Sequence, residues 1–176
     1  MTPQEVIVQL AASRQAFLAA IQGLSEETLT QTPVEGTWTI KDLIGHLTAW
    51  ELALLTPLKA RRRSLNPDNI RDADIVDVNI ADIGDVPIPD HDAWNAVQAQ
   101  KRAHWSLAQV LDEYHAVRQE LLKTLQNLEQ AEWEINRMAP WGEQAPLAKL
   151  LSGLTWHESD EHLKSIIYWK QTGRPR

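Results

Sequence analysis

The hydrophobic residues of this chain recur at helical spacing in four long segments. In the first segment, apolar residues four or seven positions apart line one face, and they include Val6, Leu10, Phe17 and Ile21. Three later segments repeat this spacing, so the pattern predicts four long amphipathic helices. The predicted helices span roughly residues 3–24, 40–63, 106–128 and 146–171.

Residues with strong preferences for helix ends support these boundaries. Ser106 and Gln109 have the spacing of a capping box, and Pro146 stands where the start of a helix tolerates proline. Pro57 favours a bend in the second long helix. A shorter pattern over residues 91–103 predicts one additional short helix.

Helical periodicity is lost between the second long helix and the short one. Residues 64–89 alternate aspartate with isoleucine or valine, a spacing that also suits a β-strand. The chain contains no second strand pattern to pair with it, so we interpret the segment as a long crossover loop, and such loops are often functional. The sequence therefore predicts one all-α domain over residues 1–176, a four-helix bundle with a long crossover loop and a short extra helix between helices 2 and 3.

Composition then narrows the classes of function. The chain has no cysteine, which excludes disulfides, thiolate metal ligands and a cysteine nucleophile. It carries 17 Lys and Arg against 24 Asp and Glu, and the resulting net charge of −7 disfavours nucleic acid as a partner. Neither the residue order of a signal peptide nor a spanning run of about 18 apolar residues is present, so we expect a cytoplasmic protein without a membrane partner. Its eight tryptophans favour core packing or an apolar pocket.

The last predicted helix carries polar residues on its apolar face. On an ideal helical wheel Glu158 lies near the middle of the apolar stripe, and His162 lies about 40° away. His157 and His162 are about 140° apart on this wheel, a separation that disfavours their binding one ion. A buried carboxylate is costly unless it is paired or bound to metal. Glu158 and His162 are therefore candidate metal ligands, and the alternative is that they bond each other or a Lys or Arg of a facing helix.

A third ligand is expected from the second long helix. His46 lies off the apolar line of that helix and Glu51 lies nearer its middle, so the wheel alone does not select His46. The other histidines, His91, His104 and His115, lie in polar surroundings and are predicted to be surface residues.

Three segments of the chain resemble one known family. The segments WTIKDLIGHLTAWE and TWHESDEHLKSI are similar to the second and last helices of the DinB-like superfamily of four-helix bundles. The last helix of that superfamily carries the pattern His, three residues, His. The segment DAWNAVQAQKRAHWSLAQVLDEYHAVRQELLKTL resembles the ClbS/DfsB-like branch. The resemblance covers residues 5–170.

The resemblance implies a metal site. In the superfamily, three histidines commonly bind a divalent metal ion such as zinc or nickel. By position, His46 matches the first and His162 the third, while the middle position falls on Glu158, with His157 just before it. The implied ligands are therefore His46, Glu158 and His162, with His157 as the alternative to Glu158. The resemblance also implies a homodimer and a low-molecular-weight thiol as cofactor.

Three functions are consistent with these observations. The first is a metal-dependent, enzyme-like protein that detoxifies a small electrophilic molecule by hydrolysis or thiol transfer, with Trp50 and Asn95 lining the substrate pocket and the catalytic base unknown. The second is a bundle that binds and sequesters a small molecule without turnover. The third is a structural, dimerising bundle whose metal site is degenerate.

Overall fold

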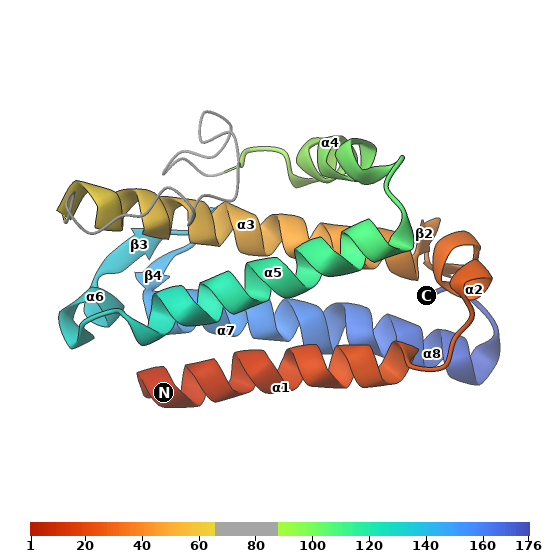
Figure 1. Cartoon of the computed structure of the whole chain (residues 1–176), viewed down its shortest axis with the longest axis horizontal. Coiled ribbons are helices and arrows are strands. Elements are labelled where there is room, and N and C mark those ends of the chain that lie inside the picture. The colour runs from red at the N-terminus through yellow and green to blue at the C-terminus, as the bar shows by residue number, and fades with distance from the viewer. Residues whose placement is uncertain (66–87) are drawn as a thin grey trace.

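A computed structural model shows four long helical rods packed side by side (Figure 1). It describes residues 1–65 and 88–176, and for residues 61–65 it describes the backbone only. Helix α3 packs against α5, and α1 packs against the last rod. The predicted all-α bundle is confirmed. The rods are α1 (Pro3–Ile21), α3 (Ile40–Leu65), α5 (Leu107–Gln126), and a continuous rod made of α7 (Leu147–Trp156), the π-helix η4 (His157–Leu163) and α8 (Lys164–Thr172).

Local chemistry fixes the ends of these rods. The predicted capping box is present at α5, where the Ser106 hydroxyl accepts from the Gln109 amide and the Gln109 side chain accepts from the Ser106 amide. Pro146 directly precedes α7, as predicted. The last rod ends at Gly173, whose φ of +69° is a left-handed conformation that glycine adopts at low cost. Helix α3 continues through Pro57 to Leu65.

Short elements join the rods. The predicted short helix is present as α4, and it lies on the outer side of α3 (Figure 1). Two small antiparallel hairpins, which we did not predict, are also present. Their strands are two or three residues long, too short to leave an alternating pattern in the sequence. The short elements are α2 (Glu26–Gln31), β1 (Pro33–Glu35), β2 (Trp38–Thr39), α4 (His91–Arg102), α6 (Gln130–Glu134), β3 (Asn136–Met138) and β4 (Gln144–Pro146).

Most of the predicted crossover loop, residues 66–87, lies outside the described residues. Within the part of the chain that the structure does describe, no helix is long and apolar enough to cross a membrane.

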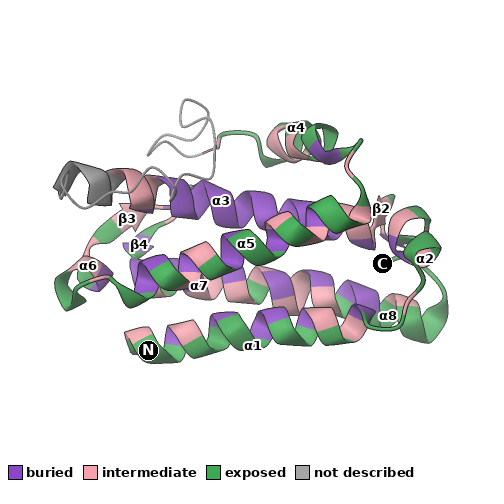
Figure 2. Ribbon diagram, in the orientation of Figure 1, coloured by how far each residue is buried: buried purple, intermediate pink, exposed green. Residues whose placement is uncertain are grey.

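Buried residues lie along the rods of the bundle (Figure 2). The apolar ones form two clusters, one toward each end of the bundle. The first includes Leu10 and Leu121, and the second includes Phe17 and Ile166. Along α1 and the last rod, buried polar residues lie between the positions that contribute to the two clusters. They are Ser13 and Arg14 of α1 and Glu158 and His162 of the last rod. Glu51 of α3 pairs with Arg14, and Arg118 of α5 pairs with Glu158.

Candidate metal centre

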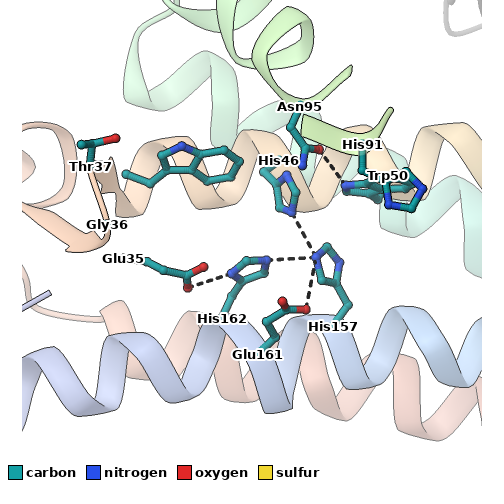
Figure 3. Close-up of a pocket in the computed structure, with 11 residues that line it drawn as sticks. Glu35, Gly36, Thr37, His46, Trp50, His91, Asn95, His157, Glu161 and His162 are labelled. Carbon is teal, nitrogen blue, oxygen red and sulfur yellow. Dashed lines mark hydrogen bonds and ion pairs between the residues drawn. The ribbon is translucent and has the colours of Figure 1, made fainter. Parts of the chain in front are cut away.

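Three histidines from two rods meet in the interior (Figure 3). The Nε2 atom of His157 lies 3.0 Å from Nε2 of His46 and 2.9 Å from Nε2 of His162. His46 comes from α3, whereas His157 and His162 come from η4. All three potential ligand atoms lie within 4.8 Å of one another, so the group could hold a metal ion.

The π-helix explains how His157 and His162 share this site. These residues are five positions apart, and an ideal α-helix separates such positions by about 140°. In a π-helix the hydrogen bonds run from i to i+5, so residues five apart lie about one turn apart on the same face. The expectation that this pair cannot converge on one ion is therefore wrong, because it assumed α-helical geometry throughout. Single π turns of this kind occur frequently at functional sites.

Glu158 points away from the histidines and into a buried ion network. Its carboxylate accepts hydrogen bonds from Arg14 Nε at 2.8 Å, Tyr114 Oη at 2.6 Å and Arg118 Nη2 at 3.1 Å, and also from the Ser13 hydroxyl. Each oxygen of the Glu158 carboxylate therefore accepts two hydrogen bonds. Of the expected ligand set, the structure brings His46 and His162 together and adds the alternative ligand His157 in place of Glu158.

Positive charge stabilises Glu158 in its ionised form. Burial raises the pKa of this carboxyl, but the guanidinium groups of Arg118 and Arg14 outweigh burial, and the pKa falls below its usual value. Both arginines also bond Glu51, a second buried carboxylate. The alternative left open by the sequence, that an arginine of a facing helix pairs with Glu158, is therefore the arrangement in the structure.

A carboxylate supports the histidine cluster from behind. Oε2 of Glu35 lies 3.0 Å from Nδ1 of His162, at the end of β1. Gly36 follows with a φ of +53°, and this left-handed turn brings the chain back into β2. A histidine that donates its Nδ1–H to a carboxylate keeps the lone pair on Nε2, which is the atom that faces the other two imidazoles.

Burial keeps two of the imidazoles neutral. Desolvation, followed by the proximity of His157 and His162, lowers the pKa of His46 to about 2. Desolvation and the nearby His162 likewise lower the pKa of His157 to about 3. Neutral imidazole is the form that binds metal, so both side chains are ready to donate a lone pair at neutral pH.

The donor set fits a divalent ion. Zinc bound to three histidine nitrogens at about 2.0–2.1 Å separates those nitrogens by about 3.3–3.4 Å in tetrahedral geometry. The Nε2 atom of His157 lies 3.0 and 2.9 Å from those of His46 and His162, close to this value. Three protein ligands with a fourth position open to solvent is the arrangement of a catalytic rather than a structural zinc site.

The open side of the cluster faces a cleft of about 580 Å³, which we call the histidine cleft. Trp38 packs edge-on against His46, and the Trp50 indole N–H donates to Oδ1 of Asn95 at 3.1 Å. The structure thus places Trp50 and Asn95, the expected pocket residues, in its wall (Figure 3). The full lining is Glu35, Gly36, Thr37, Trp38, His46, Trp50, His91, Asn95, His157, Glu161 and His162.

Comparison with known proteins identifies the family. A family model described as the DinB superfamily matches residues 9–165. The chain belongs to the DinB superfamily. No curated protein matches this member of the superfamily significantly. The finer assignment to the ClbS/DfsB-like branch stays a prediction.

Two solved structures share the fold of this DinB-superfamily chain. One is an uncharacterized protein from Clostridium difficile 630, with a TM-score of 0.71 and 12% identity over 98% of this chain and 97% of the other. The second is a protein from Streptococcus pneumoniae, with a TM-score of 0.67 and 12% identity over 97% and 91% of the two chains. At this identity the likeness shows the fold alone.

Sequence reasoning missed two carboxylates of the DinB-superfamily site. Glu35 lies outside the long helices, and nothing in its neighbourhood signals contact with a residue 127 positions away. Glu161 lines the cleft with its Oε2 3.8 Å from Nε2 of His157, and its position next to His162 was the only available signal. Of the predicted surface histidines, His104 and His115 are exposed, while His91 is exposed but also lines the cleft.

Proposed function

We propose that His46, His157 and His162 bind a divalent metal ion, zinc or nickel, and that the protein uses it to detoxify a small electrophilic molecule. The observation that carries this proposal is the convergence of three imidazole Nε2 atoms from two rods onto one side of a cleft. Members of the superfamily often bind metal ions, which supports the same conclusion. A bound divalent ion would supply Lewis acidity, activating a water or thiol and polarising the electrophile.

The surrounding residues have defined roles in this proposal. Glu35 holds the Nδ1–H of His162, and this contact keeps Nε2 directed at the ion. Glu161 is within reach of the open side and its side chain is about half exposed, so it accepts the proton that the attacking water or thiol gives up. Trp50, fixed by Asn95, forms one wall that orients the electrophile.

Two reactions are consistent with the site. In hydrolysis, the oxygen of water forms a bond to carbon as the carbon–oxygen bond of an epoxide-like electrophile breaks, and a water proton passes through Glu161 to the released oxygen. In thiol transfer, the sulfur of a low-molecular-weight thiol forms a bond to carbon as the carbon–oxygen bond of an epoxide-like electrophile breaks, and the thiol proton passes through Glu161 to the released oxygen. This thiol must come from outside because the chain has no cysteine. The cleft of about 580 Å³ is within the range that accommodates a small molecule.

Metal content is the first test. The purified, untagged protein is expected to contain close to one zinc or nickel ion per chain by inductively coupled plasma mass spectrometry. His157→Ala should lose most of this metal, because it removes the imidazole that contacts both others. The matched control is His104→Ala, which removes an exposed histidine outside the cluster and should keep the metal. Wild-type protein that stays metal-free after incubation with both ions would refute the proposal.

Turnover separates an enzyme from a binding protein. The metal-loaded protein is mixed with a model epoxide, with and without glutathione, and product is followed by mass spectrometry. Loss of product in Glu161→Gln, with metal content retained, supports the role of Glu161 as the proton acceptor. Metal binding without turnover of any electrophile in such a panel would favour a protein that sequesters its ligand.

A further inference from the structure

A second pocket adjoins the histidine cleft. It has a volume of about 290 Å³ and shares two wall residues, Trp50 and His157, with the cleft. We call it the tryptophan pocket, because three of its wall residues are tryptophans. Its lining is Trp50, Trp141, Glu143, Gly153, Leu154, Trp156 and His157.

Two indole N–H groups and the carboxylate of this pocket have partners in the structure. The Trp50 N–H donates to Asn95 on the side of the histidine cleft, and the Trp141 N–H donates to Glu143 at 3.3 Å. The Glu143 carboxylate also forms an ion pair with Lys149 at 2.7 Å. The walls therefore offer indole rings and aliphatic carbon to an occupant, and the negative charge of Glu143 is compensated.

Gly153 makes room for one of these walls. A Cβ atom added at Gly153 would lie 3.3 Å from Cζ2 of Trp141, so the indole would have to shift by a few tenths of an ångström to admit even a methyl group. Trp156 lies one turn further along α7 and is 57% exposed, which is unusual for the largest hydrophobic side chain. An exposed tryptophan beside an apolar pocket is typical of a ligand contact.

We propose that the tryptophan pocket binds an uncharged, flat apolar group of the substrate, such as an aromatic ring, while the electrophilic group lies at the three histidines. The placement of the electrophilic group at the histidines rests on the proposed function, whereas the binding of the apolar group does not. The pocket is too small for a complete drug-sized ligand but large enough for one ring system. The substrate class is thus an amphipathic molecule with a reactive polar end and an apolar end.

The test uses N-phenyl-1-naphthylamine, an uncharged probe that becomes fluorescent in apolar surroundings. The full chain, in zinc-loaded and chelator-treated forms, is titrated alongside three variants. Trp156→Ala removes a wall, Gly153→Leu fills the pocket, and Tyr168→Ala removes another exposed aromatic residue of the same rod as a control. The Kd should rise about tenfold in the first two variants and stay unchanged in the control. Equal affinity in all four proteins, or no saturable binding, overturns the inference.

A matched pair of competitors tests the charge of the occupant. Tert-butylbenzene and phenyltrimethylammonium have nearly the same shape, but only the second carries a positive charge. Because Glu143 is already paired, the neutral compound should displace the probe more effectively. Tighter binding of the cation would mean that the tryptophan faces and Glu143 form a cation site, which would overturn the proposed class.

Proximity to the histidines is tested separately. In cobalt-loaded protein the proton resonances of bound tert-butylbenzene should broaden relative to zinc-loaded protein, because the two sites share a wall. Unbroadened resonances of a bound competitor would show that the pocket does not serve the reaction site. Absence of probe binding by the wild-type protein, with its metal content intact, overturns this inference alone, whereas failure of the wild-type protein to bind any metal overturns the proposed function.

Discussion

At the scale of single residues, the histidine cluster depends on what lies behind each ligand. His162 is 4% exposed and contacts Glu35 through Nδ1, so its ring cannot rotate without breaking a carboxylate contact. Burial raises the pKa of Glu35, but the hydrogen bonds from His162 and Ser165 and the charge of Arg176 outweigh burial, so the pKa of this carboxyl falls below its usual value. An ionised partner increases the basicity of the imidazole and fixes its orientation.

Glu35→Gln should therefore weaken zinc binding without removing a ligand. Loss of a carboxylate behind a metal-binding histidine typically reduces metal affinity about 10- to 100-fold. Competition with a chromophoric chelator measures the Kd, and Glu26→Gln, at an exposed glutamate of α2, is the matched control. An unchanged Kd in Glu35→Gln would show that Glu35 does not support the site.

Glu158 shows what residue-scale reasoning could and could not predict. The wheel correctly predicted an inward carboxylate, since Glu158 is 1% exposed. It could not predict the partner, because Arg14 and Arg118 occupy ordinary polar positions of their helices in the sequence. Their guanidinium groups bury their charge against Glu158 and Glu51 only once α1, α3, α5 and the last rod are packed.

At the scale of elements, the π-helix η4 accounts for the departure from the superfamily pattern. The superfamily resemblance implies histidines separated by three residues, whereas His157 and His162 are separated by four. One additional residue in a helix is absorbed by a π turn, which keeps the flanking α7 and α8 in register. The sequence did not reveal this turn, because an ideal wheel of about 100° per residue was applied to the whole segment.

This explanation predicts that one residue can be deleted from η4. Removing Asp160 leaves His157 and His162 four positions apart in a regular α-helix, where they again share a face. The deletion removes an exposed ion pair with Lys164 and a hydrogen bond from the Ser159 hydroxyl, and exposed pairs of this kind contribute little. We expect the deletion variant to melt within a few degrees of wild type and to bind zinc within about tenfold of the wild-type Kd.

Deletion of Ser152 is the control for this experiment. Ser152 lies in the regular helix α7, so its removal rotates the preceding turn by about 100° and turns the buried Leu147 and Leu150 out of the core. That variant should be largely unfolded by circular dichroism. If both deletions unfold the protein equally, the π turn does not accommodate one additional residue in the way we propose.

At the scale of the whole molecule, periodicity and capping residues predicted the bundle, because long amphipathic helices leave a repeated signal. The histidine cluster was predicted only in part. Its assembly requires the hairpin β1–β2 to bring Glu35 to His162 and α4 to bring Asn95 to Trp50, and contacts across 127 and 45 residues leave no periodic signal. These contacts form only through tertiary packing, so the local sequence pattern could not predict them.

A metal ion bound at the histidine cluster would stabilise the folded bundle. His46 belongs to α3 and the other two histidines to the last rod, so an ion at the cluster would link these two rods directly. Any ligand that binds only the folded state stabilises it by RT ln(1 + [L]/Kd), about 4.1 kcal/mol at a concentration 1,000 times the Kd.

Removing the metal should therefore lower the melting temperature. For a chain of this size about 1 kcal/mol corresponds to about 2–4 °C, so we expect a decrease of about 10 °C when zinc at 1,000 times its Kd is replaced by a chelator. Differential scanning calorimetry measures the shift, and His162→Ala, which lacks a ligand, should melt at the same temperature with and without zinc. A zinc-dependent shift of equal size in His162→Ala would mean that the ion binds elsewhere, because stabilisation through this cluster requires all three imidazoles to hold the two rods together.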